Sequence, residues 1–128
     1  MQAPVIEIRS FKNLDLSGGV VIEAFPSVGL ISAVTGTYII SSLKLDQIAA
    51  MESAWFPPVS VIYTEKPNFP ARIYASSHHN IAVCLSEFTM PAHLDRPIAK
   101  SILSWANEQR CSLVISLCGI PVSEEGKR

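Results

Sequence analysis

Residues 81–117, IAVCLSEFTMPAHLDRPIAKSILSWANEQRCSLVISL, contain the clearest unit of the chain. The segments IAVCL (81–85) and LVISL (113–117) are apolar on both faces. Strands of this kind usually lie in the middle of a parallel sheet and are covered on both sides. We therefore expect two central parallel strands joined by one crossover, which is right-handed by default.

The connection between these two segments has the periodicity of an amphipathic helix. Its apolar residues recur at spacings of three or four, which gives one apolar stripe: Leu94, Ile98, Ile102 and Trp105. Pro97 would break a helix interior, but the first turn tolerates it because no backbone donor is needed there. The helix is therefore predicted to begin near an N-cap at Asp95.

The N-terminal part continues the α/β pattern. VIEIRS (5–10) alternates like an edge strand, Gly18 and Gly19 form a turn, and VVIEAF (20–25) is a buried strand before a helix over about 28–43. Residues 46–52 are ambiguous but strand-like. VSVIY (59–63) and ARIYAS (71–76) are interpreted as a strand pair, because prolines and Asn68 between them favour a turn.

Composition limits the classes of function. A length of 128 residues fits one α/β domain over 1–128. The 48% hydrophobic fraction and mean hydropathy of +0.31 indicate that much surface is buried inside the monomer or between subunits, so a homo-oligomer is one expectation. A net charge of −1 argues against nucleic-acid binding. The apolar stretch 28–43 is short and interrupted, and the N-terminus lacks the features of a secretory signal, so we expect a cytoplasmic protein that does not enter a membrane.

Three cysteines, Cys84, Cys111 and Cys118, form no CxxC pair and are expected to be reduced structural thiols. The histidines His78, His79 and His93 lack the spacing of a metal site. We therefore expect no metal and no cofactor.

The stretch EAFPSVGLISAVTG (23–36) resembles the strand–turn–helix layout of phosphate-binding loops. It lacks the lysine of a Walker loop and the three glycines of a dinucleotide fingerprint. Gly29, Ala33 and Gly36 share one helix face, which favours close packing of the helix against the sheet. Anion binding at the helix N-terminus remains the alternative.

Polar residues also follow the predicted strand ends, where ligands tend to bind in open α/β sheets. Ser27, Gly29, Ser86, Glu87 and Gly119 are the candidate pocket, with Glu87 as an acid or base. The alternative is that the serines bond to turn backbone and Glu87 is a solvated loop carboxylate, since one carboxylate alone specifies no chemistry. No catalytic residue is assigned.

The segment SAWFPPVSV (53–61) is a candidate protein interface. Trp55 and Phe56, followed by Pro57 and Pro58, are rigid aromatic anchors of the kind that partner-binding surfaces use. The alternative is that both aromatics pack as a small satellite core under the sheet edge.

Taken in order along the chain, several segments resemble the proteasome assembly chaperone 2 family in its archaeal form. They are FPSVGLISAVTGTYII, LKLDQIAAMESAWFPPVSVIY, ARIYAS, NIAVCLSEF, ILSWANEQRC and VISLCGIP. The positions that match the family pattern are Phe25, Pro26 and Gly29; Pro57 and Pro58; Ser86, Glu87 and Phe88; and Gly119, Ile120 and Pro121.

The resemblance implies a three-layer α/β/α fold with a mostly parallel or mixed sheet, similar to the phosphorylase/hydrolase-like fold. It also implies a non-enzymatic chaperone or scaffold that works with itself and with proteasome α-subunits. Family members continue past the Gly-Ile-Pro exit, so the chain is expected to be an incomplete copy of a longer family domain. The other hypothesis is an enzyme or small-ligand binder that uses the strand-end pocket near Ser27, Glu87 and Gly119.

Overall fold

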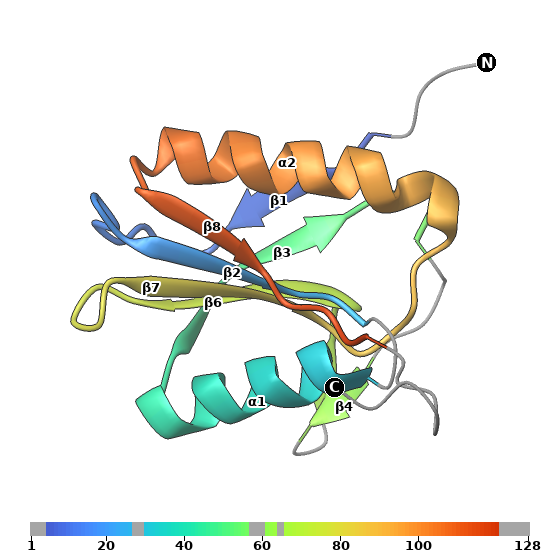
Figure 1. Ribbon diagram of the computed structural model, residues 1–128, viewed down its shortest axis with the longest axis horizontal. Helices are drawn as coiled ribbons and strands as arrows, with labels where there is room; N and C mark the ends of the chain where they lie inside the picture. Colours follow the sequence, from blue (N-terminus) through green and yellow to red (C-terminus); the bar gives the residue numbers. More distant parts are fainter. Residues whose placement is uncertain (1–4, 27–29, 57–60, 64–65, 121–128) are drawn as a thin grey trace.

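The structure, a computed structural model, describes residues 5–26, 30–56, 61–63 and 66–120. Its centre is a mixed six-stranded sheet with the order β1-β3-β6-β7-β2-β8. Helix α2 covers one face of this sheet and α1 covers the other (Figure 1). The predicted three-layer α/β/α fold is confirmed. The elements are β1 (Glu7–Ser10), β2 (Val20–Ala24), α1 (Ile31–Leu43), β3 (Asp46–Glu52), β4 (Val61–Tyr63), β5 (Lys66–Asn68), β6 (Ala71–Ser76), β7 (Ile81–Ser86), the 3-10 helix η2 (Ala92–Leu94), α2 (Asp95–Glu108) and β8 (Leu113–Ser116).

Strand β2 lies between β7 and β8 and runs parallel to both. Val20 is in register with Ile81 of β7 and with Leu113 of β8. The residues of β7 are almost entirely buried, as expected for a strand that is apolar on both faces. The predicted parallel arrangement of segments 81–85 and 113–117 is therefore confirmed, with β2 inserted between them.

Strand β8 is not central in the described part of the sheet, so this prediction is wrong there. β8 is the last strand in the order and pairs only with β2 among the described residues. Its side chains Leu113 and Ile115 are 52% and 39% exposed. An apolar strand was expected to have neighbours on both sides, but in the described residues its second neighbour is absent.

The predicted pairing of residues 59–63 with 71–76 is also wrong. β6 lies inside the main sheet, antiparallel to both β3 and β7, whereas β4 pairs with β5 in a separate two-stranded sheet. β6 has buried residues on both faces, as expected for a strand of a sheet that is covered on both faces. The ambiguous segment 46–52 forms β3, which pairs with β6 and with the edge strand β1.

Helix α2 packs through the predicted stripe, since Leu94, Ile98, Ile102 and Trp105 are all buried. Pro97 lies in the first turn, as predicted. Asp95 is the first helical residue rather than the N-cap, because the 3-10 turn η2 leads directly into the helix. Leu94 occupies the cap position and makes no side-chain cap hydrogen bond.

Helix α1 packs through small residues. Gly36 faces β2 so closely that an added Cβ would lie 2.6 Å from the Cβ of Ala24. Ser32 is fully buried and its hydroxyl donates a hydrogen bond to the carbonyl of Phe25. The predicted close packing is confirmed for Ala33 and Gly36, whereas Gly29 lies outside the described residues.

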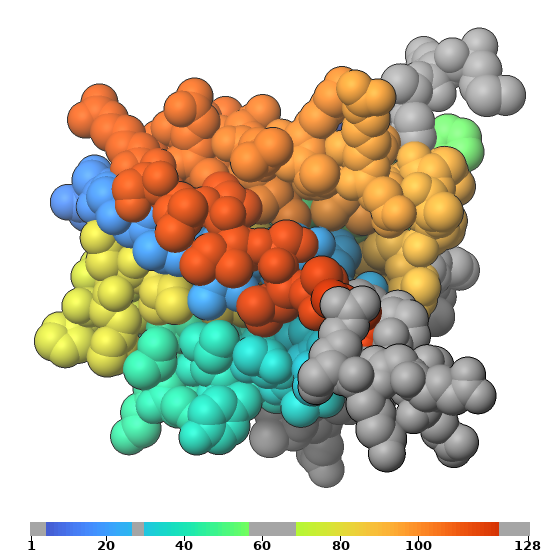
Figure 2. Space-filling model, viewed as in Figure 1, coloured from blue at the N-terminus to red at the C-terminus, as the bar shows by residue number. Residues whose placement is uncertain are grey.

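The two faces of the sheet are covered differently. The α2 side holds the large buried side chains, with Leu16, Met51, Phe56 and Ile73 packed under the helix stripe. The α1 side is a smaller cluster built around Ile22, Ala24, Val83 and Leu85. Figure 2 shows α1, β8 and α2 together on one face of the molecule.

Of the cysteines, Cys84 is buried, Cys111 half-buried and Cys118 exposed, and all three are free thiols, as expected. Burial raises the pKa of Cys84 and of Cys111 above the ordinary thiol value. Both thiols are therefore protonated at neutral pH and poor nucleophiles. The helices of the described residues are too short and not apolar enough to cross a bilayer.

Candidate functional site

Glu87, the predicted acid or base, lies at the end of β7 and bonds to Arg72 of β6. The guanidinium donates two parallel hydrogen bonds to the carboxylate, from Nη1 at 3.0 Å and from Nη2 at 2.6 Å. The side chain of Arg72 is 1% exposed and that of Glu87 is 25% exposed. The candidate acid or base is thus one half of a largely buried, bidentate ion pair.

Arg72 makes further contacts that fix its position. Its Nε donates to the Tyr74 hydroxyl at 2.8 Å, and Nη1 donates to the carbonyl of Phe69 at 2.7 Å. Burial opposes the charge, but the hydrogen bonds that Arg72 donates to Glu87 and Tyr74 outweigh this effect and raise the pKa of Arg72 above its ordinary value. Both oxygens of the Glu87 carboxylate are thus bonded to a fixed guanidinium, which is the geometry of a structural ion pair rather than of a free acid or base.

Ser86 is buried and bonds within its own turn. Its hydroxyl accepts from the backbone N–H of Phe88 and lies 3.1 Å from the carbonyl of the same residue. This local bonding is the pattern of a serine that stabilises a strand exit. Gly119 is half-buried after β8. Ser27 and Gly29 of the candidate pocket lie outside the described residues, so the complete group remains a prediction.

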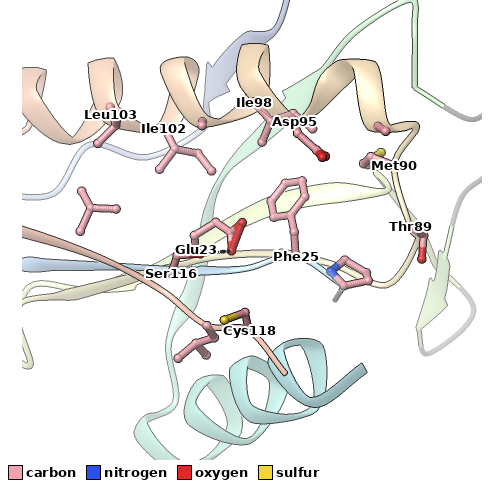
Figure 3. A pocket seen from close by; sticks show the side chains of 15 residues that line it. Glu23, Phe25, Thr89, Met90, Asp95, Ile98, Ile102, Leu103, Ser116 and Cys118 are labelled. Carbon is pink, nitrogen blue, oxygen red and sulfur yellow. Dashed lines mark hydrogen bonds between the residues drawn. The ribbon is translucent and has the colours of Figure 1, made fainter. Parts of the chain in front are cut away.

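A different cavity lies at the carboxyl ends of β2 and β8. It has a volume of about 560 Å³ and is enclosed by α2, the two strands and the segment after β7. Most of its lining is apolar, including Phe25, Met90, Ile98 and Ile102. Figure 3 shows Glu23 on the sheet side of this cavity and Asp95 on the helix side.

Glu23 is the most perturbed carboxyl of this cavity. Burial raises the pKa of Glu23 above its ordinary value, and hydrogen bonds from the Phe25 backbone and the Ser116 hydroxyl only partly offset this effect. The nearby charge of Asp95 adds to the rise. The described lining residues include no lysine, arginine or histidine. The cavity therefore favours uncharged or cationic groups over anions.

Sequence reasoning missed Arg72, Glu23 and Asp95 as site residues. Arg72 lies between apolar neighbours in ARIYAS, and no role was predicted for it. A charge in a strand that is otherwise apolar signals a buried ion pair, and that signal was available. Glu23 could have been found in the same way, because it interrupts VVIEAF. Asp95 was interpreted only as a helix cap.

The aromatic segment divides between the surface and the interior. Phe56 is buried in the main core, whereas Trp55 is 47% exposed and lies edge-on to His93, with ring centroids 6.0 Å apart. Pro57 and Pro58 lie outside the described residues. Trp55 therefore remains a candidate for a protein contact, and Phe56 is a core residue. Within the described residues, no three His, Cys, Asp or Glu side chains are grouped as a metal site would require.

The protein is thus a three-layer α/β/α domain in which the Arg72–Glu87 ion pair lies at the end of β7. Comparison with known proteins agrees with the resemblance noted in the sequence. The profile of the PAC2 family matches residues 21–128, and the chain belongs to this family.

Two relatives are 26% identical to this chain. An uncharacterized protein of Methanocaldococcus jannaschii matches over 115 residues, which are 90% of this chain and 48% of that protein. Pyrococcus furiosus PbaA, an archaeal homologue of proteasome-assembly chaperone, has a TM-score of 0.80 over 91% of this chain and 50% of PbaA.

Pyrococcus furiosus PbaB, an archaeal proteasome activator, shares the fold. It is 18% identical with a TM-score of 0.77, over 94% of this chain and 53% of PbaB. The chain thus spans about half the length of the relatives it matches.

Proposed function

We propose that this chain is a non-enzymatic, protein-binding chaperone or scaffold whose partners are proteasome α-subunits. The observation that carries the proposal is its similarity to PbaA over nearly the whole chain, in sequence and in fold. Function depends on a site as well as on a fold.

The geometry supports a binding role more than a catalytic one. The Glu87 carboxylate is hydrogen-bonded to Arg72, and the Ser86 hydroxyl bonds within its own turn. The thiols of Cys84 and Cys111 have raised pKa values, which makes them poor nucleophiles. The described residues instead expose large apolar side chains on α1, β8 and the Trp55 segment. Apolar surface of this extent is typical of proteins that bind other proteins.

The test is binding to purified proteasome α-subunits from the same organism. We expect the immobilised chain to retain the α-subunits and to change the rate at which they assemble into rings. An unrelated α/β protein of similar size is the control. Equal retention by the chain and by the control, with no change in the assembly rate, would contradict the proposal.

A second candidate is a small-ligand binder, favoured by the cavity beneath α2. The cavity lies at the strand ends where open α/β sheets bind ligands, although its described lining differs from the pocket expected around Ser27, Glu87 and Gly119. Thermal-shift screening should include nucleosides, nucleotides, anions and amines. A rise in Tm that Glu23→Gln abolishes would favour this candidate, because ligand binding to the folded state stabilises it.

A further inference from the structure

The cavity beneath α2 has a buried apolar wall. Phe25, Met90, Ile98 and Ile102 line it and are each less than 10% exposed, and we call these four residues the inner wall. Leu103 also lines the cavity but is 56% exposed, so the cavity opens to solvent on this side. Its volume of about 560 Å³ lies within the range of small-molecule sites, about 300–1,000 Å³. The space is therefore large enough for a small organic molecule.

The charged groups among the described lining residues are two carboxylates. Glu23 is half-buried on the sheet side, and Asp95 is exposed on the helix side. Figure 3 shows both carboxylates directed into the space between the sheet and α2. The other polar side chains of the described lining are the hydroxyls of Thr89 and Ser116 and the thiol of Cys118. Within the described lining, negative charge is thus not balanced by positive charge.

The two carboxylates also lack a cationic partner elsewhere in the described part of the chain. Neither Glu23 nor Asp95 belongs to an ion pair of the described residues. The Ser116 hydroxyl donates a long hydrogen bond of 3.4 Å to Glu23. Glu87 in the same sheet differs, because its charge is balanced by Arg72. A half-buried carboxylate without a cation is the kind of group that a positively charged ligand stabilises.

We propose that this cavity binds a small organic ammonium ion, with its head group between Glu23 and Asp95 and its apolar body against the inner wall. The inference rests on the second candidate function above and names its ligand class. The three N–H donors of a primary ammonium match carboxylate and hydroxyl acceptors, and such charge-assisted hydrogen bonds are stronger than neutral ones. An anionic ligand would instead meet two like charges.

The shape and chemistry of the inner wall favour a free amine over the lysine side chain of a partner protein. A lysine side chain is a single butyl arm, which would leave most of the cavity of about 560 Å³ unfilled. The inner wall also contains an aromatic ring and a thioether, from Phe25 and Met90, and both make favourable contacts with aromatic groups. We therefore expect a ligand with a bulky apolar body, of which an arylalkylammonium is an example.

Isothermal titration calorimetry of the purified chain at neutral pH tests the head group and the body separately. 3-Phenylpropylammonium should bind at least about tenfold more tightly than 3-phenylpropanol, because only the ammonium makes charge-assisted hydrogen bonds. 3-Phenylpropionate should not bind. Methylammonium, which lacks the apolar body, should bind at least about tenfold more weakly than 3-phenylpropylammonium. An alcohol or carboxylate that binds as tightly as the ammonium, or no binding of 3-phenylpropylammonium, would overturn the proposal.

Substitutions inside and outside the cavity test the two carboxylates. Glu23→Gln keeps the size of the side chain and removes its charge, so the Kd of 3-phenylpropylammonium should rise by about ten- to a hundredfold. Asp95→Asn should raise it by about two- to fivefold, because the charge of this exposed residue is screened. Glu108→Gln, at an exposed position of α2 that does not line the cavity, changes the net charge equally and should leave the Kd within about twofold of the wild type.

Circular dichroism verifies that the variants fold. An unchanged Kd in both folded cavity variants, or an equal rise in Glu108→Gln, would overturn the assignment of the head-group site. The head-group series on the wild type tests the same assignment without any substitution.

Methyl NMR locates the bound probe. Met90 belongs to the inner wall, whereas Met51 is buried in the main core and does not line the cavity. The phenyl ring of 3-phenylpropylammonium should shift the ¹³C-methyl signal of Met90 and leave that of Met51 unchanged. A probe that binds without shifting the Met90 signal lies elsewhere and would overturn the proposal.

A capped lysine distinguishes the two sources of an ammonium group. Nα-acetyl-lysine methylamide presents the lysine side chain without a protein, and it should bind at least about tenfold more weakly than 3-phenylpropylammonium. Binding as tight as that of 3-phenylpropylammonium would assign the cavity to a lysine of a partner protein and overturn the assignment to a small molecule.

The outcome is separable from those of the functions proposed above. A chain that retains α-subunits but binds no ammonium probe would overturn this inference and leave the chaperone proposal standing. A Tm raised by a nucleoside or nucleotide but not by 3-phenylpropylammonium would keep the small-ligand candidate and overturn its ligand class. Binding of the ammonium at Met90 by a chain that does not retain α-subunits would support the inference and contradict the chaperone proposal.

Discussion

The two helices cover opposite faces of one sheet and do so in opposite ways. α2 buries large side chains such as Ile102 and Trp105 and exposes charged ones such as Lys100 and Glu108. α1 buries small residues and exposes large apolar ones such as Val34 and Tyr38. α2 is therefore an ordinary surface helix, whereas α1 has the composition of an interior helix. The difference leaves large apolar side chains uncovered on α1, whereas α2 turns most of its own toward the sheet.

The largest expected effect is on the α2 side. Trp105→Ala removes a large buried side chain from the main core and should lower the free energy of unfolding by about 3–5 kcal/mol. Urea denaturation measures it. Leu103→Ala, on the exposed side of the same helix, is the control and should cost less than about 1 kcal/mol. Equal losses in the two variants would mean that α2 is not held by its inward stripe.

On the α1 side, a change by a single methyl group tests the close contact. Gly36→Ala would place a Cβ 2.6 Å from the Cβ of Ala24. We expect a loss of about 1–3 kcal/mol from overpacking, although alanine in a helix is otherwise favoured over glycine by about 1 kcal/mol. Ser42→Ala, at an exposed position of α1, controls for helix propensity and should be neutral or slightly stabilising. A more stable Gly36→Ala variant would show that α1 is free to move outward.

These two helices also show what the sequence could and could not predict. The stripe of α2 was readable because its large residues recur at spacings of three and four. In α1, Gly36 indicated close packing, but the exposure of Ile31, Val34 and Tyr38 was not predicted. Because apolar residues occur on all sides of this helix, the sequence does not show which side faces the sheet. The position of a strand in a sheet depends on pairing between distant segments. For that reason the interior position of β6, and the position of β8 at the end of the sheet that the described residues form, were not predicted.

The candidate site was predicted in part. Glu87 and Ser86 were correctly predicted to follow a strand, but the ion pair of Glu87 with Arg72 was not predicted. Arg72 is fifteen positions away in sequence and reaches Glu87 only because β6 and β7 pair in register, with Arg72 opposite Leu85. The cavity beneath α2 likewise combines Glu23 of β2 with Asp95 of α2, and no local pattern joins them.

The smallest expected effect is the pH dependence of stability that Glu23 contributes on the α2 side of the sheet. Because the pKa of Glu23 is raised in the folded protein, the folded state binds this proton more tightly than the unfolded state does. Stability should therefore fall as the pH rises from the unfolded pKa of Glu23 through its folded pKa. Glu23→Gln should flatten this fall and slightly raise Tm at neutral pH. Thermal melts across this pH range, with Ser42→Ala as a variant that keeps the wild-type slope, measure the effect; an unchanged slope in Glu23→Gln would contradict it.

Hydroxyl-radical footprinting of the purified chain tests directly whether α1 turns its large apolar side chains outward while α2 turns its own inward. Oxidation of Tyr38 on α1 should be fast and oxidation of Trp105 on α2 slow, because Tyr38 is 71% exposed and Trp105 is 5% exposed. A Tyr38 that is protected as strongly as Trp105 would contradict this account of the two helices.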